Sequence, residues 1–203
     1  MCCRYYMEGR EPDGKLAAIV DMMEKNWPGA YRTGEIFPGD TAPAIIAAGG
    51  KIKAVPAVFG FPGFENGKQL LNARSETAAS KRSFAESLRS RRIILPATEF
   101  YEWSRGSDRT KYSFRAGSDH ALYLCGIYRV VEDHLCFVIL TREAEGPIAE
   151  IHDRMPVIAS ESEVRPYLTD YESALAIIAA EAPELIRENA KQHNSTDRSE
   201  EKG

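Results

Sequence analysis

Hydrophobic residues first recur with a helical period near the amino terminus, over residues 13–27 (DGKLAAIVDMMEKNW). Four apolar residues fall on one face of a helix there: Leu16, Ile19, Val20 and Met23. A Pro-Gly pair follows at residues 28–29, and this pair does not continue a helix. We therefore expect an amphipathic helix that packs one face against the core.

Extended and turn patterns follow. The stretch GEIFPGDTAPAII (residues 34–46) is punctuated by Pro and Gly, and AVPAVFGF (residues 54–61) is an apolar run that ends at a Pro-Gly pair. A short apolar run between turn residues is typical of a buried strand. We expect strands here, then a turn at residues 65–67 (ENG) and a short strand over residues 68–74 (KQLLNAR).

Residues 75–92 return to helical spacing, with Ser75 as a candidate cap and Phe84 and Leu88 one turn apart. Residues 68–92 hold seven basic side chains against two acidic ones, a net charge of +5 in a chain whose net charge is −4. Such a run is either a solvated helical face or a phosphate-binding surface. The basic residues are Lys68, Arg74, Lys81, Arg82, Arg89, Arg91 and Arg92.

The second half of the chain begins with strand-like segments, separated by turns rich in Gly, Asp and Ser, which favours antiparallel pairing. These segments are residues 92–103, 111–116, 121–131 and 135–141, followed by a turn and strand over 148–158. Helical patterns come next, broken by Pro166, and the clearest covers residues 171–189. We expect an α+β fold in one domain, residues 1–189, and a polar, disordered tail over residues 190–203.

The composition is ordinary for a globular protein, with 43% hydrophobic and 28% charged residues. No apolar run reaches the roughly 18–20 residues that span a membrane, and the start MCCRYYMEGR lacks the apolar segment of a secretory signal. We therefore expect a cytoplasmic protein in a reducing compartment, without disulfides. Cys125 and Cys136 lie in apolar runs, no Cys or His has zinc-site spacing, and we expect two buried thiols and no metal.

Cys2 is chemically distinct because it follows the initiator methionine. Removal of Met1 would expose an α-amine beside a thiol. An α-amine has a pKa of about 7.7–8.0, against about 10.4 for lysine, so far more of it is neutral at pH 7. A neutral amine adds to an aldehyde to form a Schiff base, and the thiol can then close on the imine carbon to give a five-membered thiazolidine.

Four segments carry a resemblance to a known family. They are the start MCCRYY, NARSET at residues 72–77, LPATEFYEW at residues 95–103 and HDRMPVI at residues 152–158. In this order they resemble the SOS response-associated peptidase (SRAP) family, which has an MCGR-type start, an NAR-x-ET segment, a P-A-x-x-[FY]-[YF]-EW strand and an H-x-RMP segment. The resemblance runs from Met1 to about Tyr167.

The resemblance implies a twisted, β-barrel-like core with a groove for single-stranded DNA. It also implies that the amino-terminal cysteine cross-links to the ring-opened aldehyde of an abasic site, which would shield the lesion in the DNA damage response. Met1 would first be removed by the protein itself, in a cysteine-peptidase reaction that gives the family its name. Schiff-base chemistry at such a site also permits weak lyase activity through β-elimination.

The resemblance also implies roles for site residues. Glu102 would be the catalytic carboxylate beside the α-amine, His152 would donate protons to the sugar and to intermediates, and Asn72 would hold Cys2 or the sugar hydroxyl. Each has a structural alternative: a surface glutamate, a hydrogen-bonded structural histidine and a turn-forming asparagine. Glu99 lies an odd number of residues from Glu102 and so would face the other side of a regular strand.

Arg4 and Arg74 match family positions that contact phosphates near the lesion. Phe61 and Trp103 are candidates for stacking on bases, although such aromatic residues more often lie in the core. Thr141 resembles a threonine that lines the family's site. Cys3 departs from the pattern, since the family has glycine there, and it adds a second thiol beside the reactive residue.

Two other classes of function stay open. An N-terminal-nucleophile amidohydrolase or peptidase would use the Cys2 thiol against an amide, with its own amine as base. A non-catalytic module would only bind single-stranded DNA through the basic segment. The expected partner is single-stranded DNA that contains abasic sites, bound by a monomer, nucleoid-associated when on DNA, with no cofactor, metal or membrane.

Overall fold

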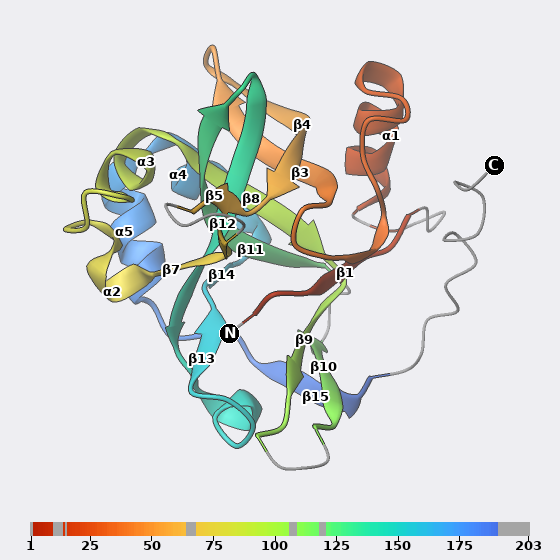
Figure 1. Cartoon of the computed structure of the whole chain (residues 1–203), viewed down its shortest axis with the longest axis vertical. Helices are drawn as coiled ribbons and strands as arrows, with labels where there is room; N and C mark the ends of the chain where they lie inside the picture. Colours follow the sequence, from red (N-terminus) through yellow and green to blue (C-terminus); the bar gives the residue numbers. More distant parts are fainter. Residues whose placement is uncertain are drawn as a thin grey trace.

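The computed structural model describes residues 2–9, 14, 16–63, 68–105, 109–117 and 121–190, and most of its strands lie in two sheets (Figure 1). The smaller of the two has the strand order β15-β10-β9-β1-β2, and neighbouring strands are antiparallel. Its members are β1 (Tyr5–Met7), β2 (Gly34–Ile36), β9 (Glu99–Trp103), β10 (Lys111–Ala116) and β15 (Leu185–Asn189).

The larger sheet has the order β13-β12-β4-β3-β8-β11-β14, and β7 pairs with β12 from outside this path. Because β11 also pairs with β12, five strands (β12, β4, β3, β8 and β11) form a closed ring of pairings. Its members are β3 (Thr41–Ala48), β4 (Lys51–Phe59), β7 (Asn72–Arg74), β8 (Arg92–Ala97), β11 (Leu122–Val131), β12 (His134–Glu143), β13 (Arg154–Pro156) and β14 (Ile158–Ala159). A further small pair joins β5 (Phe61–Pro62) to β6 (Gln69–Leu70).

The helices lie around these sheets, as Figure 1 shows: α2 to α5 gather on one side of the molecule and α1 stands on the other. They are α1 (Ala17–Asn26), α2 (Ser75–Ala78), α3 (Ala85–Ser90), α4 (Glu161–Thr169) and α5 (Tyr171–Ala179), with a 3₁₀ turn, η1, at Gly146–Ile148. The expected α+β class is therefore confirmed. All six residues of β8 are buried, because this strand lies inside the larger sheet and α4 packs on it.

The amphipathic helix near the amino terminus is confirmed as α1, which buries Ile19, Val20 and Met23. Among the predicted strands, β10 has the expected bounds and β11 and β12 have shifted ends, whereas residues 68–74 divide into β6 and β7. The turn expected at residues 65–67 and nearly all of the expected disordered tail lie outside the described residues. Cys125 and Cys136 are both buried, as expected of structural thiols.

The expected single helix over residues 75–92 is wrong, because it divides into α2 and α3 with a turn between them. Ser75 is the first helical residue and Arg74 holds the cap position. Phe84 and Leu88 do lie one turn apart, joined by the bond from the Leu88 N–H to the Phe84 carbonyl at 2.8 Å. Both side chains are buried, so tertiary packing sets the start of α3.

The helix expected over residues 171–189 is also corrected, because it ends at Ala179 and the last five residues form β15. β15 pairs along the whole of its length with β10, an edge that would otherwise be open. Pro166 lies inside α4, and the helical break falls instead at Asp170. The Asp170 side chain accepts a hydrogen bond from the Ser173 N–H at 2.6 Å and so begins α5.

The expected strand over residues 92–103 is two strands, and they belong to different sheets. β8 ends at Ala97, β9 begins at Glu99, and Thr98 lies between them. The Thr98 N–H donates to the Tyr6 carbonyl at 2.7 Å, and its hydroxyl accepts from the Glu8 N–H at 3.1 Å. These two hydrogen bonds join Thr98 to β1 and the residue after it, at the point where the chain passes from the larger sheet into the smaller one.

Candidate active site

The amino-terminal strand places Cys2 inside the protein. β1 lies between β2 and β9, and its pairing with β9 continues toward the terminus through the bond from the Tyr101 N–H to the Arg4 carbonyl at 3.0 Å. The Cys2 side chain is fully buried. Its thiol donates to the Arg4 carbonyl with an Sγ···O distance of 3.7 Å, a weak bond two residues away.

Glu102 shares this buried region. Its side chain is only 3% exposed, and burial raises the pKa of its carboxyl group to about 7. The charge of Asp153 adds to the rise, and the charge at the amino terminus of the chain opposes it. A carboxyl group with such a pKa is partly protonated at neutral pH and can either take or give a proton.

Electrostatic coupling links Cys2 to Glu102. Burial raises the pKa of the Cys2 thiol well above its ordinary value, and the negative charge of Glu102 raises it further. The pKa of Cys3 is raised for the same two reasons, although this side chain is only partly buried. Both thiols are therefore protonated at neutral pH, so an amine at this position would be the better nucleophile.

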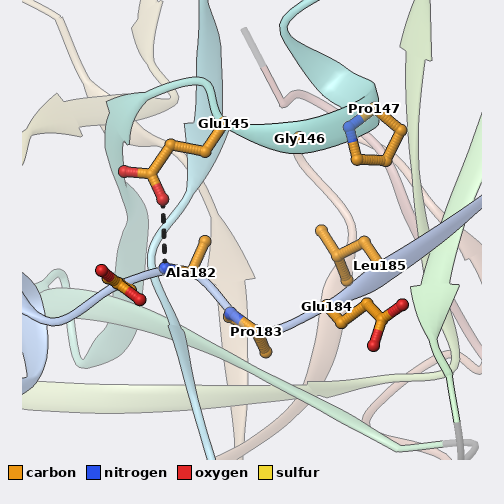
Figure 2. A pocket seen from close by; sticks show the side chains of 8 residues that line it. Glu145, Gly146, Pro147, Ala182, Pro183, Glu184 and Leu185 are labelled. Atoms are coloured by element: carbon orange, nitrogen blue, oxygen red, sulfur yellow. Dashed lines mark hydrogen bonds between the residues drawn. The ribbon is translucent and has the colours of Figure 1, made fainter.

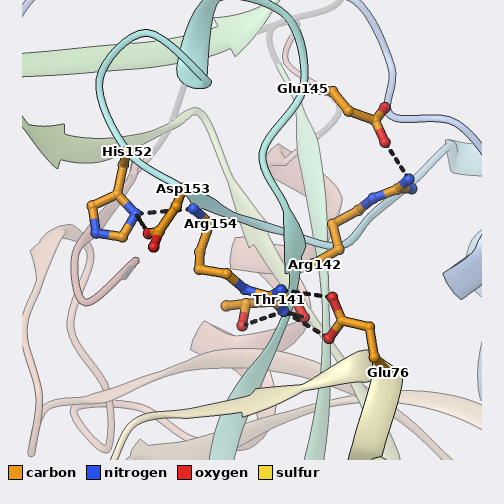
Figure 3. Close-up of polar contacts among 7 residues, drawn as sticks. All are labelled: Glu76, Thr141, Arg142, Glu145, His152, Asp153 and Arg154. Atoms are coloured by element: carbon orange, nitrogen blue, oxygen red, sulfur yellow. Dashed lines mark hydrogen bonds and ion pairs between the residues drawn. The ribbon is translucent and has the colours of Figure 1, made fainter.

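His152 follows η1 and lies just before β13 (Figure 3). Its Nδ1 accepts a hydrogen bond from the Arg154 N–H at 3.0 Å and lies 3.0 Å from Oδ1 of Asp153. Burial lowers the pKa of the imidazole, so the neutral ring prevails at pH 7. Because Nδ1 accepts from the backbone, the proton of the neutral ring is assigned to Nε2.

Asp153 joins the two sides of the site. Its Oδ1 lies 2.8 Å from Nη2 of Arg105, a residue that follows β9, and its charge acts on Glu102. The loop after β9 and the segment before β13 are thereby connected. Since β9 carries Glu102 and His152 precedes β13, this ion pair bridges the two segments that carry the candidate proton-transfer groups.

Arg154 is a site residue that the sequence analysis did not single out, although it stands within the HDRMP segment. Its guanidinium binds both carboxylate oxygens of Glu76 in α2, at 2.6 and 2.8 Å (Figure 3). It also donates to the Thr141 carbonyl at 2.5 Å. The bidentate guanidinium is therefore engaged by Glu76 and Thr141, and it ties α2 and β12 to the segment that carries His152.

Asn72 and Thr141 lie on the neighbouring strands β7 and β12, which are parallel. Thr141 is fully buried and stands opposite Arg74, whose side chain is exposed. The Oδ1 atom of Asn72 is buried and has no hydrogen-bond partner among the described residues. A buried acceptor without a partner is costly, which makes Asn72 a candidate to bind a ligand.

Arg4 lies in a cluster of aromatic and charged side chains on the smaller sheet, with members from β2, β9 and β10. Its guanidinium stacks over Phe37 at 4.3 Å and over Trp103 at 5.1 Å from the ring centroids. Glu35 lies 3.5 Å from Arg4 and 2.8 Å from Nζ of Lys111. The cluster thus presents a partly exposed tryptophan between two cations, a combination that suits a nucleobase and its phosphate.

Phe61 lies elsewhere, in the core. Its side chain is fully buried, its ring is 6.4 Å from that of Phe84, and the guanidinium of Arg129 covers it at 4.6 Å. It is therefore not presented for base stacking in this structure.

Glu99 shares its face of β9 with Tyr101, whose hydroxyl donates to it at 2.6 Å, and Glu102 faces the other side, as expected.

Three further observations concern metal ions, membrane spans and pockets. Within the described ranges, no group of three or more His, Cys, Asp and Glu residues is arranged to hold a metal ion. The same residues include no helix with the length and apolar character of a membrane span. A pocket of about 360 Å³ beside β15, whose rim includes Glu145, Pro183 and Glu184 (Figure 2), shares no lining residue with the candidate site.

Comparison with known proteins identifies the family of the chain. The model of the family described as "SOS response associated peptidase (SRAP)" matches residues 1–194. "Abasic site processing protein YobE" of Bacillus subtilis (strain 168) is 37% identical over 109 residues, and the match spans about half of each chain. "Abasic site processing protein YedK" of Escherichia coli (strain K12) is 24% identical over 178 residues, 82% of this chain and 79% of that one.

Solved structures share the fold. A protein from Bordetella bronchiseptica has a TM-score of 0.72 at 19% identity, covering 94% of this chain and all of that one. A phage-related protein from the same species has a TM-score of 0.71 at 23% identity, covering 94% and 95% of the two chains. From the family match over residues 1–194, the chain belongs to the SOS response associated peptidase (SRAP) family.

Proposed function

We propose that this protein processes abasic sites in single-stranded DNA by forming a covalent thiazolidine link through Cys2, after Met1 has been removed. The single observation that carries the proposal is the burial of Cys2 in electrostatic contact with Glu102, whose pKa is raised to about 7. Family membership and the names of the Bacillus and Escherichia relatives, abasic site processing proteins, support the substrate class.

The proposed reaction has two steps. The neutral amine of Cys2 adds to the aldehyde carbon of the ring-opened sugar, and one water molecule leaves as the imine forms. The Cys2 sulfur then attacks the imine carbon, the C–S bond forms, the C=N electron pair moves to nitrogen, and the thiol proton ends on that nitrogen. Closure consumes the imine and so suppresses the β-elimination that would cut the strand.

Each neighbouring group has a role that fits its protonation state. Glu102 takes the proton of the α-amine, because a carboxylate with a pKa of about 7 is close to the pKa of an amine of about 7.7–8.0. His152, neutral and protonated on Nε2, gives a proton to the sugar oxygen as the ring opens or to the hydroxyl that leaves as water. Asn72, with its unpartnered oxygen, binds a sugar hydroxyl.

Removal of Met1 is part of the proposal, as a peptidase reaction of the chain on itself. Hydrolysis of the bond before Cys2 consumes one water and exposes the amine, and in this proposal Glu102 acts as the base. The intact mass of the purified chain measures this step. We expect all wild-type chains to lack Met1 and a measurable fraction of Glu102→Gln chains to keep it. If Met1 is absent from all chains of both proteins, another enzyme removes it.

One assay tests the main proposal. The Met1-processed protein is mixed with a single-stranded oligonucleotide carrying one abasic site and analysed by denaturing electrophoresis. Wild type should give a covalent complex; Cys2→Ala and a chain lengthened by an uncleavable amino-terminal tag should give none. A wild type that binds without a covalent band would instead be a non-catalytic binding module, and an undiminished band with Cys2→Ala would sink the proposed chemistry.

A further inference from the structure

Tyr5 is a buried residue that the proposed reaction has not yet used. It lies in β1, opposite Ile36 of β2 and Phe100 of β9, and its ring lies 6.1 Å from that of Phe59. The side chain is fully buried. Its hydroxyl oxygen has no hydrogen-bond partner among the described residues.

Packing does not account for this hydroxyl. Leaving a buried hydroxyl without a partner costs free energy, whereas phenylalanine would fill the same aromatic site beside Phe59 without that cost. The hydroxyl is therefore expected to find its partner in another state of the protein. The partner of the Tyr5 hydroxyl would then be a group that changes position during the reaction.

Cys2 is that group. Burial raises the pKa of Tyr5, and the charge that Cys2 would carry as a thiolate raises it further, ahead of the charge of Asp40. Asp40 is occupied in the β2–β3 turn, where its Oδ2 accepts from the Phe37 N–H at 2.9 Å. The Cys2 thiol has only its long bond of 3.7 Å to the Arg4 carbonyl, which it gives up when the sulfur turns toward an imine on its own nitrogen.

We propose that the Tyr5 hydroxyl is a positioning group for ring closure, donating a hydrogen bond to the Cys2 sulfur as the sulfur leaves the Arg4 carbonyl. This inference rests on the proposed function and deepens it. Closure itself is as described: the C–S bond forms, the C=N electron pair moves to nitrogen, and the thiol proton passes to that nitrogen. The phenol keeps its own proton throughout and acts only by orienting the sulfur at the imine carbon.

Tyr5→Phe removes the hydroxyl and keeps the ring, and Tyr6→Phe is the matched control, on the opposite face of the same strand. The two reaction steps are separated by quenching with or without borohydride, which traps the imine as a stable amine. The link formed without borohydride measures closure, and the link formed with it measures imine plus closed ring.

For Tyr5→Phe we expect imine formation at the wild-type rate and closure slowed by about fivefold, the effect of one hydrogen bond. Tyr6→Phe should match wild type in both steps. Thermal unfolding should show Tyr5→Phe at least as stable as wild type, since it removes an unpaired buried hydroxyl.

Closure by Tyr5→Phe at the wild-type rate would overturn the inference and leave the proposed function intact. An equal slowing of both steps would also overturn it, because the hydroxyl would then support the site as a whole. Wild type that forms no link even with borohydride would refute the proposed function, and the role of Tyr5 with it.

Discussion

Glu102 is a carboxyl group held where burial disfavours its charge, with a pKa raised to about 7. A surface glutamate would be stable but fully ionised at neutral pH. The raised pKa makes the group a better proton carrier and makes the folded protein less stable. Local instability of this kind is common at catalytic positions.

The variant Glu102→Gln tests whether the raised pKa of Glu102 lowers the free energy of unfolding. The folded state holds the Glu102 proton more tightly than the unfolded state, so the free energy of unfolding falls as pH rises from about 4.5 to about 7. Glutamine does not titrate, so the variant should exceed wild type by up to roughly 3 kcal/mol at pH 8, and less at pH 5. Urea denaturation at both pH values measures the difference. The exposed Glu184→Gln is the control and should change the free energy of unfolding by less than about 0.5 kcal/mol, and a destabilised Glu102→Gln at pH 8 would contradict the assignment.

His152→Ala is expected to act on rate alone. Loss of a general acid typically slows a reaction by about 10²-fold or more, while the imidazole is not needed to hold the phosphate backbone. The variant should therefore bind an oligonucleotide with wild-type affinity, measured by fluorescence anisotropy, and form the covalent link about 10²-fold more slowly. Weakened binding at an unchanged rate would instead identify His152 as a binding residue.

At the level of elements, Arg92 shows how one strand residue secures two helices. Its guanidinium is buried and donates to carbonyls at the ends of α3 and α4: Leu88 at 2.9 Å, Tyr167 at 2.6 Å and Leu168 at 3.2 Å. It also donates to the Arg89 carbonyl. Carbonyls at the end of a helix lack partners within the helix, and a cation there satisfies them. Arg92 is therefore structural, although it belongs to the basic segment.

Arg92→Met should keep most of the volume of the side chain and leave these carbonyls unsatisfied. We expect a loss of about 3 kcal/mol in the free energy of unfolding, measured in urea. Arg82→Met, at an exposed position in the turn before α3, is the control and should change stability by less than about 0.5 kcal/mol. Equal stabilities for the two variants would show that the Arg92 hydrogen bonds contribute nothing net.

At the scale of the whole molecule, α2 and α3 lie on the side of Figure 1 opposite α1, and the chain from Arg74 to Arg92 that contains them is rich in exposed basic residues. Some charges of the basic segment are already engaged, because Arg92 is buried and Arg91 lies 2.8 Å from Glu86. The exposed basic residues near these helices in the chain are Arg74, Lys81, Arg82 and Arg89, and the Arg89 guanidinium lies 5.2 Å from the centroid of the Tyr171 ring. This is a local positive surface on a chain with a net charge of −4.

Charge reversal at Lys81 and Arg82 separates the two interpretations of this surface. If it binds phosphates, the double variant should bind a single-stranded oligonucleotide more weakly, and the slope of log K against log salt should fall by about 1.4. Lys25→Glu, in α1, is the control and should change neither quantity. An unchanged slope in the double variant would leave the residues as a solvated helical face.

The local elements were largely predictable because they depend on patterns of a few residues. The helix α1 follows from the spacing of Ile19, Val20 and Met23, and β10 has the predicted bounds. The division of residues 75–92 and the strand at Leu185–Asn189 were not predictable in this way. Both are decided by contacts with distant parts of the chain, namely the core around Phe84 and the open edge of β10.

The sequence by itself determined the α+β class, the aminothiol potential of Cys2 and, through its motifs, the family. Only the tertiary structure decided which side chains share the site. The passage of the chain between sheets at Thr98 brings β9 beside β1, so Glu102 and Cys2 share one buried region. It also placed Phe61 in the core and revealed the unpartnered hydroxyl of Tyr5, because burial and the absence of a partner are properties of the packed molecule that no pattern along the chain records.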